Sequence, residues 1–215
     1  IQFGLPSEKI FIVEEGVFVP TQEDLSVIPQ STDFSEPRIL LFLARLHPVK
    51  GLELLLEALS LVRPRGWQCK IAGMGSPSYV LELQKSVDRY GLNEIVAFCG
   101  PLSGEEKDRA FSEASAFVLP SYTESFGISI AEAMAWALPV ITTTETPWSI
   151  VKEKKMGWIV SPKISSISES IFQLTQTSSQ ELNDMGLRAR TYVKERYDWN
   201  YLGIRMAKIY ESLMS

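Results

Sequence analysis

Short apolar runs alternate regularly with longer amphipathic segments along most of the chain. Residues 39–46 are almost continuously apolar, broken only by Arg45, which is typical of a strand buried on both faces. Residues 52–62 then place leucines at helical spacing i, i+3, i+4 and i+7. Repeated strand–helix units predict an α/β fold, a doubly wound parallel sheet with helices on both faces.

The same pattern continues to the end of the chain. Strands are predicted at 9–13, 39–46, 68–72, 95–99, 116–119, 139–143 and 158–160. Helices are predicted after Lys50 and at 78–90, 105–114, 126–137, 167–175, 179–196 and 201–214. A polar connector is expected at 21–37, and Gly91 is expected to end the helix before it.

The overall charge narrows the partners that the chain can bind. Its 215 residues carry a formal net charge of −5, whereas sequence-independent binding of nucleic acid needs a basic face. We therefore expect no nucleic-acid partner, while a local pair of cations can still hold a small phosphorylated ligand. No apolar stretch reaches the length of a membrane span, and no secretory signal is visible.

The cysteines and the histidine give little sign of metal or nucleophilic chemistry. Cys69 and Cys99 lie in separate predicted strands and form neither a CxxC motif nor a metal-binding spacing. We expect two buried thiols in a reducing compartment. His47 is the only histidine, and it fits a loop residue better than a general base.

Four loops with unusual chemistry follow predicted strands, namely 45–51, 73–77, 100–103 and 121–127. In an open parallel sheet, ligands bind beyond the carboxyl ends of the strands, near the switch in strand order. Four such loops at one edge predict one site.

The first of these loops offers two cations. Arg45 ends a predicted strand and Lys50 precedes a predicted helix, so both are expected to project into the same crevice. Arginine can hold a diphosphate bidentately and lysine adds a point charge, which suits such a ligand. The alternative, a surface arginine and a lysine that flanks a helix, is equally consistent with this loop alone.

The fourth loop and its helix carry the most information. Ser125 is an expected N-cap, and Gly127 allows a ligand to approach the backbone, where free N–H groups can receive an anion. Glu124 lies before the helix, and Glu132 lies seven residues beyond Ser125, roughly 10 Å along the axis. Carboxylates repel phosphates but accept hydrogen bonds from hydroxyls, so a nucleotide-sugar fits the pattern. The spacing alone fits better with one acid that is favourable to the helix dipole and another on a solvated face.

The glycine-rich loops are weaker signals. Gly73-Met74-Gly75 and Gly100-Pro101 are consistent with simple turns. Together with their strands they could also form a slot for a flat base, with backbone groups facing its edge.

These motifs together resemble glycosyltransferase family 4. The central match is the Glu-x7-Glu pattern of Glu124 and Glu132 within residues 121–135. The other matching stretches are Arg45 with Lys50-Gly51, 71–75, 96–100, 139–142 and 197–199. They follow in register over nearly the whole chain.

The resemblance implies a role for each site residue. Arg45, Lys50 and Glu124 are the expected catalytic residues: the two cations would hold the diphosphate and offset leaving-group charge, and Glu124 would contact the transferred sugar. Glu132 would bind the ribose hydroxyls. The remaining donor-binding residues would be Gly73, Gly75, Cys99, Gly100, Pro101, Ser125, Phe126, Gly127 and Ile128.

The resemblance also implies an architecture. Family members have the GT-B arrangement of two Rossmann-like domains, and this chain resembles only the C-terminal, donor-binding one. Residues 1–37 would then be a crossover segment and linker from a missing N-terminal acceptor-binding domain, 38–196 the Rossmann-like nucleotide-sugar-binding domain, and 197–215 a C-terminal helix. We expect a fragment of a longer protein that is inactive alone.

The activity implied is transfer of a hexose, with retained anomeric configuration, from a nucleotide-diphosphate sugar to a glycan or lipid-linked acceptor. No metal or other cofactor is expected. The parent protein is expected in the cytoplasm, in cell-surface polysaccharide biosynthesis, with peripheral contact at the inner face of the membrane left open.

The sequence departs from the family pattern at four places. Glu15-Gly16-Val17-Phe18 stands where Asn-Gly-Val-Asp is common, and Ala44 and Ala137 replace glycines. The loop Glu145-Thr146-Pro147-Trp148 is typical of a subgroup, which leaves the contacts to the sugar open.

Three other classes of protein are alternatives to this assignment. A non-catalytic nucleotide-sugar-binding subunit stays open, although intact Arg45, Lys50, Glu124 and Glu132 argue against degeneration. A nucleotide-sugar epimerase needs acid–base residues that are not found. A dinucleotide-dependent oxidoreductase is disfavoured because no GxGxxG follows the first central strand.

Overall fold

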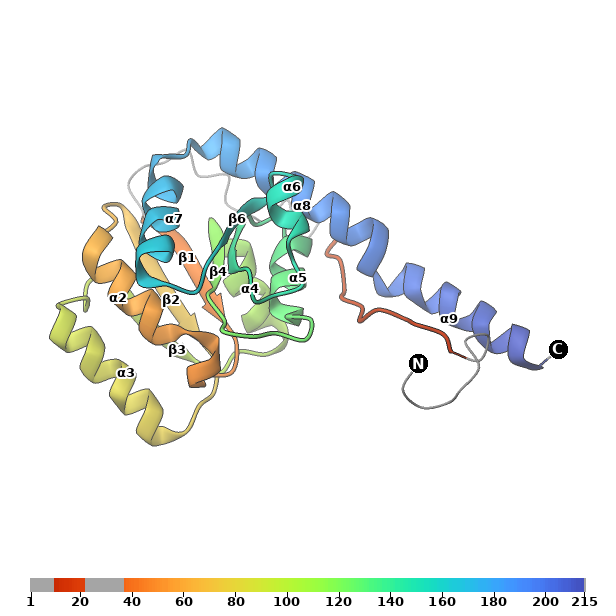
Figure 1. The fold of residues 1–215 in the computed structure, drawn as a ribbon, viewed down its shortest axis with the longest axis horizontal. Coiled ribbons are helices and arrows are strands. Elements are labelled where there is room, and N and C mark those ends of the chain that lie inside the picture. The colour runs from red at the N-terminus through yellow and green to blue at the C-terminus, as the bar shows by residue number, and fades with distance from the viewer. Residues whose placement is uncertain (1–9, 22–36, 215) are drawn as a thin grey trace.

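The computed structural model describes residues 10–21 and 37–214 (Figure 1). Its strands are β1 Arg38–Leu43, β2 Trp67–Ala72, β3 Val96–Gly100, β4 Ala116–Leu119, β5 Val140–Thr143 and β6 Gly157–Val160. Its α-helices are α2 Leu52–Val62, α3 Pro77–Tyr90, α4 Gly104–Glu113, α5 Ile128–Ala135, α6 Ile150–Glu153, α7 Ile164–Gln176, α8 Ser179–Tyr197 and α9 Trp199–Met214. A 3₁₀ helix, η2, covers Pro48–Lys50.

The strands form one parallel sheet in the order β3-β2-β1-β4-β5-β6. Strand β1 lies inside the sheet, where it pairs with β2 along its whole length and with β4 through Leu40 and Leu41. The chain therefore reverses its direction of travel across the sheet between β1 and β4, which is the topological switch point. The predicted doubly wound α/β fold is confirmed.

Helices cover both faces of this sheet. Helix α2 packs against α3 and α7, while α5 packs against α8 (Figure 1). The predicted leucine face of α2 is confirmed, since Leu52, Leu55, Leu56 and Leu59 are fully buried. Gly91 ends α3 in the left-handed conformation, with φ of 61°, as predicted.

Several boundaries differ from the prediction. Strand β1 ends at Leu43 rather than at residue 46, because the chain bends there and Leu46 makes only an isolated bridge with Gly75. Helix α5 begins at Ile128, two residues later than predicted. Helices η2 and α6 were not predicted, since three or four residues are too few to show a helical period.

The strand predicted at 9–13 is wrong for residues 10–13, which form no regular structure; Lys9 lies outside the described residues. The segment 10–21 instead runs beside α9 (Figure 1). Val17 forms an isolated parallel bridge with Asp198, and the Arg205 guanidinium donates to the Ile12 carbonyl at 3.1 Å. The apolar residues 10–13 thus line a helix instead of joining a sheet. The connector predicted at 21–37 lies outside the described residues except at its two ends.

The two cysteines differ in their burial. Cys69 on β2 is buried as predicted, and burial, followed by its neighbour Cys99, raises its pKa to about 12. Cys99 is exposed, so the prediction of a buried thiol is wrong there. The reason is the strand order, because β3 is an edge strand. No helix among residues 10–21 and 37–214 has both the length and the apolarity to cross a bilayer.

Candidate functional site

The four loops selected from the sequence meet at the carboxyl edge of the sheet. Because all six strands are parallel, every loop that follows a strand emerges there. Main-chain hydrogen bonds join the loops: Leu46 N–H to Met74 O at 2.8 Å, Gly73 N–H to Gly100 O at 2.8 Å, and Tyr122 N–H to Val49 O at 2.8 Å. The predicted gathering of these loops is therefore confirmed.

Gly73 and Gly75 let two of these loops lie against each other. A Cβ atom on Gly73, whose φ is 144°, would lie 1.8 Å from the Ala44 carbonyl oxygen. One on Gly75 would lie 2.6 Å from the Leu46 carbonyl oxygen. Both glycines are thus required by close backbone packing, whatever they contribute to a ligand.

The loop after β3 is more open. Gly100 has a φ of 72°, and a Cβ atom there would meet nothing within 4 Å. Cys99 and Pro101 on either side of it are exposed. The stretch therefore presents accessible backbone at the same edge.

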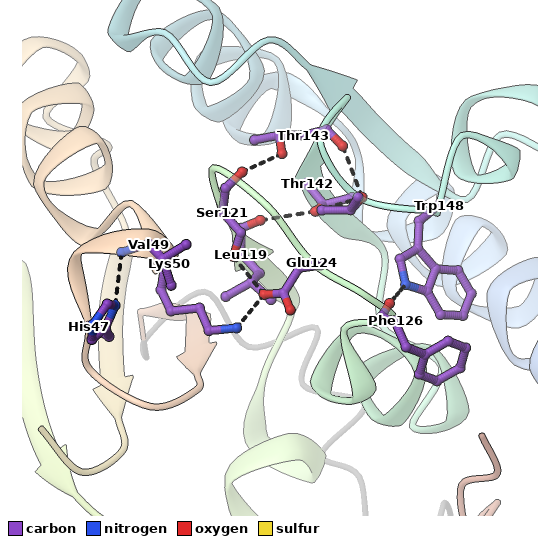
Figure 2. A network of polar contacts seen from close by, with 11 residues as sticks. His47, Val49, Lys50, Leu119, Ser121, Glu124, Phe126, Thr142, Thr143 and Trp148 are labelled. Atoms are coloured by element: carbon purple, nitrogen blue, oxygen red, sulfur yellow. Dashed lines mark hydrogen bonds and ion pairs between the residues drawn. The ribbon is translucent and has the colours of Figure 1, made fainter. Parts of the chain in front are cut away.

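Lys50 and Glu124 form the central contact of the site. Lys50 Nζ lies 2.5 Å from Glu124 Oε1, and their side chains are only 17% and 9% exposed. The Ser121 hydroxyl donates to the same oxygen at 2.8 Å (Figure 2). Lys50 follows β1 and Glu124 follows β4, so the ion pair spans the topological switch point.

Lys50 is held by a short, well-capped turn. His47 accepts a hydrogen bond from Val49 N–H through Nδ1 at 3.3 Å and caps η2, a structural role that agrees with its prediction as a loop residue. Gly51 then turns the chain with φ of 69°, and a Cβ there would lie 2.2 Å from the Pro120 carbonyl oxygen. This packing places the end of η2 directly against the loop that carries Glu124.

Arg45 lies on the bend after β1 and is exposed. Within the part of the chain that the structure describes, its side chain makes no hydrogen bond or ion pair. In the described part of the chain, Lys50 is therefore anchored by an ion pair and Arg45 is not, although both belong to the same loop.

The start of α5 differs from its prediction. Ser125 is exposed and does not cap the helix; the N-cap is Gly127, with φ of 80°. Only glycine adopts this conformation easily, and it places the helix start after a sharp turn that the sequence pattern around Ser125 does not reveal. Among the described residues, no acceptor is bonded to the N–H groups of Gly127 and Ile128. These donors remain available at the start of α5, which is where an anion is favoured.

Glu132 lies one turn into α5 and is paired with a second lysine. Lys107 Nζ, from α4, is 2.7 Å from Glu132 Oε1, with side chains 30% and 22% exposed. The two predicted carboxylates are therefore not in contact with each other. Each is held by its own lysine.

Strand β5 and the loop after it support the loop after β4 through side chains. The Thr143 hydroxyl donates to the Ser121 carbonyl at 2.6 Å, and the Thr142 hydroxyl donates to the Leu119 carbonyl at 2.9 Å. Trp148 donates through Nε1 to the Phe126 carbonyl at 2.5 Å (Figure 2). These hydrogen bonds help to fix the shape of the loop after β4.

Sequence reasoning missed Ser121, Lys107, Thr142 and Thr143 as parts of this site. Ser121 was within a selected loop, so its position was a usable signal. The two threonines lay in an apolar strand, where a hydroxyl at a carboxyl end suggests a bond to a neighbouring loop. The role of Lys107 could not be predicted from the residues around it, because its partner Glu132 is distant in the sequence.

The assembled edge offers cations, free N–H donors and carboxylates. Ammonium and N–H groups suit phosphate, whereas the carboxylates suit hydroxyl donors. Among the described residues, no three His, Cys, Asp or Glu side chains gather in a group that could hold a metal ion.

The six-stranded parallel sheet with helices on both faces is Rossmann-like and matches the fold of one half of solved GT-B structures. The sequence pattern of the family glycosyl transferases group 1 matches residues 26–192, and the chain belongs to that family.

Relatives and solved structures agree with this membership. The amylovoran biosynthesis glycosyltransferase AmsK of Erwinia amylovora is 24% identical over 99% of this chain and 53% of its own length. The D-inositol 3-phosphate glycosyltransferase of Jonesia denitrificans is 26% identical over 97% of this chain and 53% of its own. The chain spans about half the length of the curated relatives it matches.

Among solved structures, Anabaena Alr3699/HepE in complex with UDP-glucose superposes with a TM-score of 0.80 at 22% identity. The match covers 98% of this chain and 60% of that one. A glycosyltransferase from Rickettsia africae gives a TM-score of 0.82 at 20% identity, over 98% of this chain and 59% of that one. At these identities the likeness concerns the fold.

Proposed function

We propose that this chain is the donor-binding half of a retaining glycosyltransferase of family 4. In this proposal the parent enzyme moves a hexose from a nucleotide-diphosphate sugar to a glycan or lipid-linked acceptor. The relatives named for colanic acid and amylovoran biosynthesis support a cell-surface polysaccharide as the product.

The observation that carries the proposal is the Lys50–Glu124 pair across the switch point, beside the free N–H groups of Gly127 and Ile128. A lysine ammonium has three donors, and only one is needed for Glu124. The others can bind a diphosphate that sits on the start of α5. Glu124 can then lie next to the anion, because the positive charge of Lys50 reduces the repulsion between the carboxylate and the diphosphate.

Arg45 would complete the grip on the diphosphate. Its exposed side chain, with no partner among the described residues, is at liberty to close on a phosphate after the ligand arrives. Both cations would then stabilise the negative charge that develops on the departing diphosphate. Glu124 would accept hydrogen bonds from hydroxyls of the transferred sugar.

Glu132 would bind the ribose hydroxyls, one turn further along α5. Lys107 would hold that carboxylate in place and reduce its repulsion of the diphosphate. The backbone around Gly73, Gly75 and Gly100, with Cys99 and Pro101, would provide the slot for the base. Ser125, Phe126, Gly127 and Ile128 would line the sugar and phosphate side.

The domain arrangement is part of the same proposal. Residues 1–37 would come from the crossover to an acceptor-binding domain, 38–196 would form the donor domain, and 197–215 would form a C-terminal helix. The reaction would use no metal and no cofactor beyond the sugar donor. The parent enzyme would work in the cytoplasm, with peripheral contact at the inner face of the membrane where the acceptor is a lipid.

The test is thermal unfolding of the chain with UDP, GDP, ADP and their hexose conjugates. A ligand at ten times its dissociation constant adds roughly 1.4 kcal/mol, or about 3–6 °C for a domain of this size. We expect a shift with one base, lost in Arg45→Ala and kept in Arg65→Ala, which removes an exposed arginine next to the amino end of β2. No shift with any of these ligands would contradict donor binding by this chain.

A second comparison separates the two carboxylates. Glu132→Ala should weaken binding of the sugar-free nucleoside diphosphate more than Glu124→Ala does, because only Glu132 is assigned to the ribose. Glu106→Ala, at an exposed position of α4, is the control. Equal losses in the two variants would remove the ribose assignment.

A further inference from the structure

We infer that Trp148 is a positioning residue for the donor site, which it serves by fixing the peptide between Phe126 and Gly127. The inference rests on the proposed function for its link to the donor. Trp148 belongs to the loop 145–148, in which the sequence departs from the usual family pattern. It does not contact the proposed ligand positions itself, since its side chain is only 2% exposed.

Three hydrogen bonds connect residues 143–148 to the donor loop, defined here as residues 121–127. Thr143 Oγ1 donates to the Ser121 carbonyl at 2.6 Å, and Glu124 N–H donates to the Glu145 carbonyl at 3.2 Å. Trp148 Nε1 closes the series at the Phe126 carbonyl (Figure 2). The donor loop is therefore held at its beginning, middle and end by one neighbouring segment.

The bond from Trp148 determines where the next N–H group points. The chain contains no cis peptide among its described residues, and in a trans peptide the C=O and N–H bonds point in opposite directions. The Phe126 carbonyl is turned inward to the indole, so the Gly127 N–H is turned away from it. That N–H is one of the unbonded donors at the start of α5.

Aromatic packing keeps the indole from shifting. The ring of Phe126 lies 5.3 Å from that of Trp148 and 5.4 Å from that of Tyr197, and Trp148 and Tyr197 are 5.5 Å apart, measured between ring centroids. These tilted and edge-to-face contacts are favourable geometries for aromatic rings. The three rings make the site of the hydrogen bond rigid from both sides.

The backbone at Gly127 has little conformational freedom once Trp148 is bonded to the Phe126 carbonyl. Its φ is 80°, and a Cβ atom at this position would lie 3.5 Å from Trp148 Nε1 and 3.6 Å from Glu124 Cγ. The turn therefore lies close to both the indole and the Glu124 side chain. Loss of the indole N–H would free the 126–127 peptide to rotate, and both the N–H donors and Glu124 would move with it.

The experiment compares Trp148→Phe, which keeps an aromatic ring and removes the donor, with Trp67→Phe at a buried tryptophan of β2. The first readout needs no ligand: NMR hydrogen exchange of the Glu124 and Ile130 amides, whose N–H groups bond to the Glu145 and Gly127 carbonyls. We expect exchange of both to rise by about tenfold in Trp148→Phe, the effect of losing one good hydrogen bond. Trp67→Phe should leave both rates unchanged.

The second readout is calorimetric affinity for UDP, GDP and ADP. We expect Trp148→Phe to weaken the tightest of the three by about tenfold, since displaced anion donors lose most of their interaction, and Trp67→Phe to leave it unchanged. Unchanged exchange in Trp148→Phe would overturn the inference, as would faster exchange with full affinity. A wild-type chain that binds none of the three would count against the proposed function, while the exchange rates would still decide the role of Trp148 in the loop.

Discussion

The loops after β1, β2 and β3 are held together differently from the loops after β4 and β5. In the first group, backbone lies directly on backbone, and glycines make the approach possible: Gly73 on the Ala44 carbonyl and Gly75 on the Leu46 carbonyl. In the second group, the side chains of Thr143, at the end of β5, and Trp148 donate to carbonyls of the donor loop, beside one main-chain bond from the Glu124 N–H to the Glu145 carbonyl. One half of the edge is fixed by the absence of side chains and the other by their hydrogen bonds.

The two halves of the edge should respond differently to substitutions. Where backbone packs directly on backbone there is no space for added atoms, so a new methyl group forces the two loops apart. A side-chain network can lose one bond and keep its shape approximately. We therefore expect large, abrupt effects on stability in the first group and smaller effects, confined to the loop, in the second. The Lys50–Glu124 pair joins the two groups.

The largest effect should come from Gly73→Ala. The new Cβ would lie 1.8 Å from a backbone oxygen, and φ of 144° is strained for alanine. We expect a loss of about 3 kcal/mol or more in the free energy of unfolding, measured by urea denaturation. Gly100→Ala, with open space around it and φ of 72°, should cost only about 1 kcal/mol. Equal losses would show that backbone strain, rather than the contact, controls this group.

The second effect should come from Lys50→Met. It removes the charged partner of a carboxylate whose side chain is only 9% exposed, and Ser121 alone remains. We expect a loss of about 2 kcal/mol. Lys70→Met breaks a more exposed pair with Glu113 and should cost less than about 1 kcal/mol. If Lys70→Met cost as much as Lys50→Met, the pair at the switch point would not be a special link.

A smaller effect is expected for Thr143→Val, which has nearly the same shape and lacks the hydroxyl. The buried Ser121 carbonyl would lose its 2.6 Å donor, at about 1 kcal/mol in urea denaturation. Thr144→Val, at an exposed neighbour, is the control and should be neutral. A loss near that of Gly73→Ala would erase the distinction between the two halves of the edge.

The smallest effect on stability should come from Lys107→Met. Its pair with Glu132 is partly exposed, so solvent screens it, and we expect a change within about 0.5 kcal/mol. Affinity for a nucleoside diphosphate should nevertheless fall several-fold, because Glu132 would lose its support. If the variant binds the nucleoside diphosphate like the wild type, Lys107 contributes only surface charge and does not support Glu132.

The parts of the structure that could be predicted are those whose conformation is determined by residues close together in the sequence. The apolar run at 39–46 and the leucines of 52–62 predicted a strand and a helix because each carries its own period. The gathering of the four loops followed from parallel strands alone. Ala137, which stands where the family pattern usually has glycine, has a positive φ of 58°, and the sequence analysis did not predict this conformation.

The unpredicted parts depend on partners far away in the chain. Lys107 meets Glu132 only because the fold brings α4 close to α5, and the Trp148 bond to Phe126 needs β4 and β5 to be neighbours. Ser125 satisfied a local rule for an N-cap, but the positive φ of Gly127 displaced the helix start. Residues 10–13 have strand-like composition, yet no sheet edge reaches them among the described residues.

The position of β1 inside the sheet has a consequence for synthesis on the ribosome. Strands β1, β2 and β3 are consecutive, so they can pair as soon as they emerge. The opposite edge of β1 must wait for β4, since Leu40 is in register with Ala116. During that interval the apolar strand around Leu41 and Phe42 presents an open edge to other chains. A pause in translation before β4 has emerged from the ribosome would prolong this exposure, whereas a pause after β4 has emerged would not.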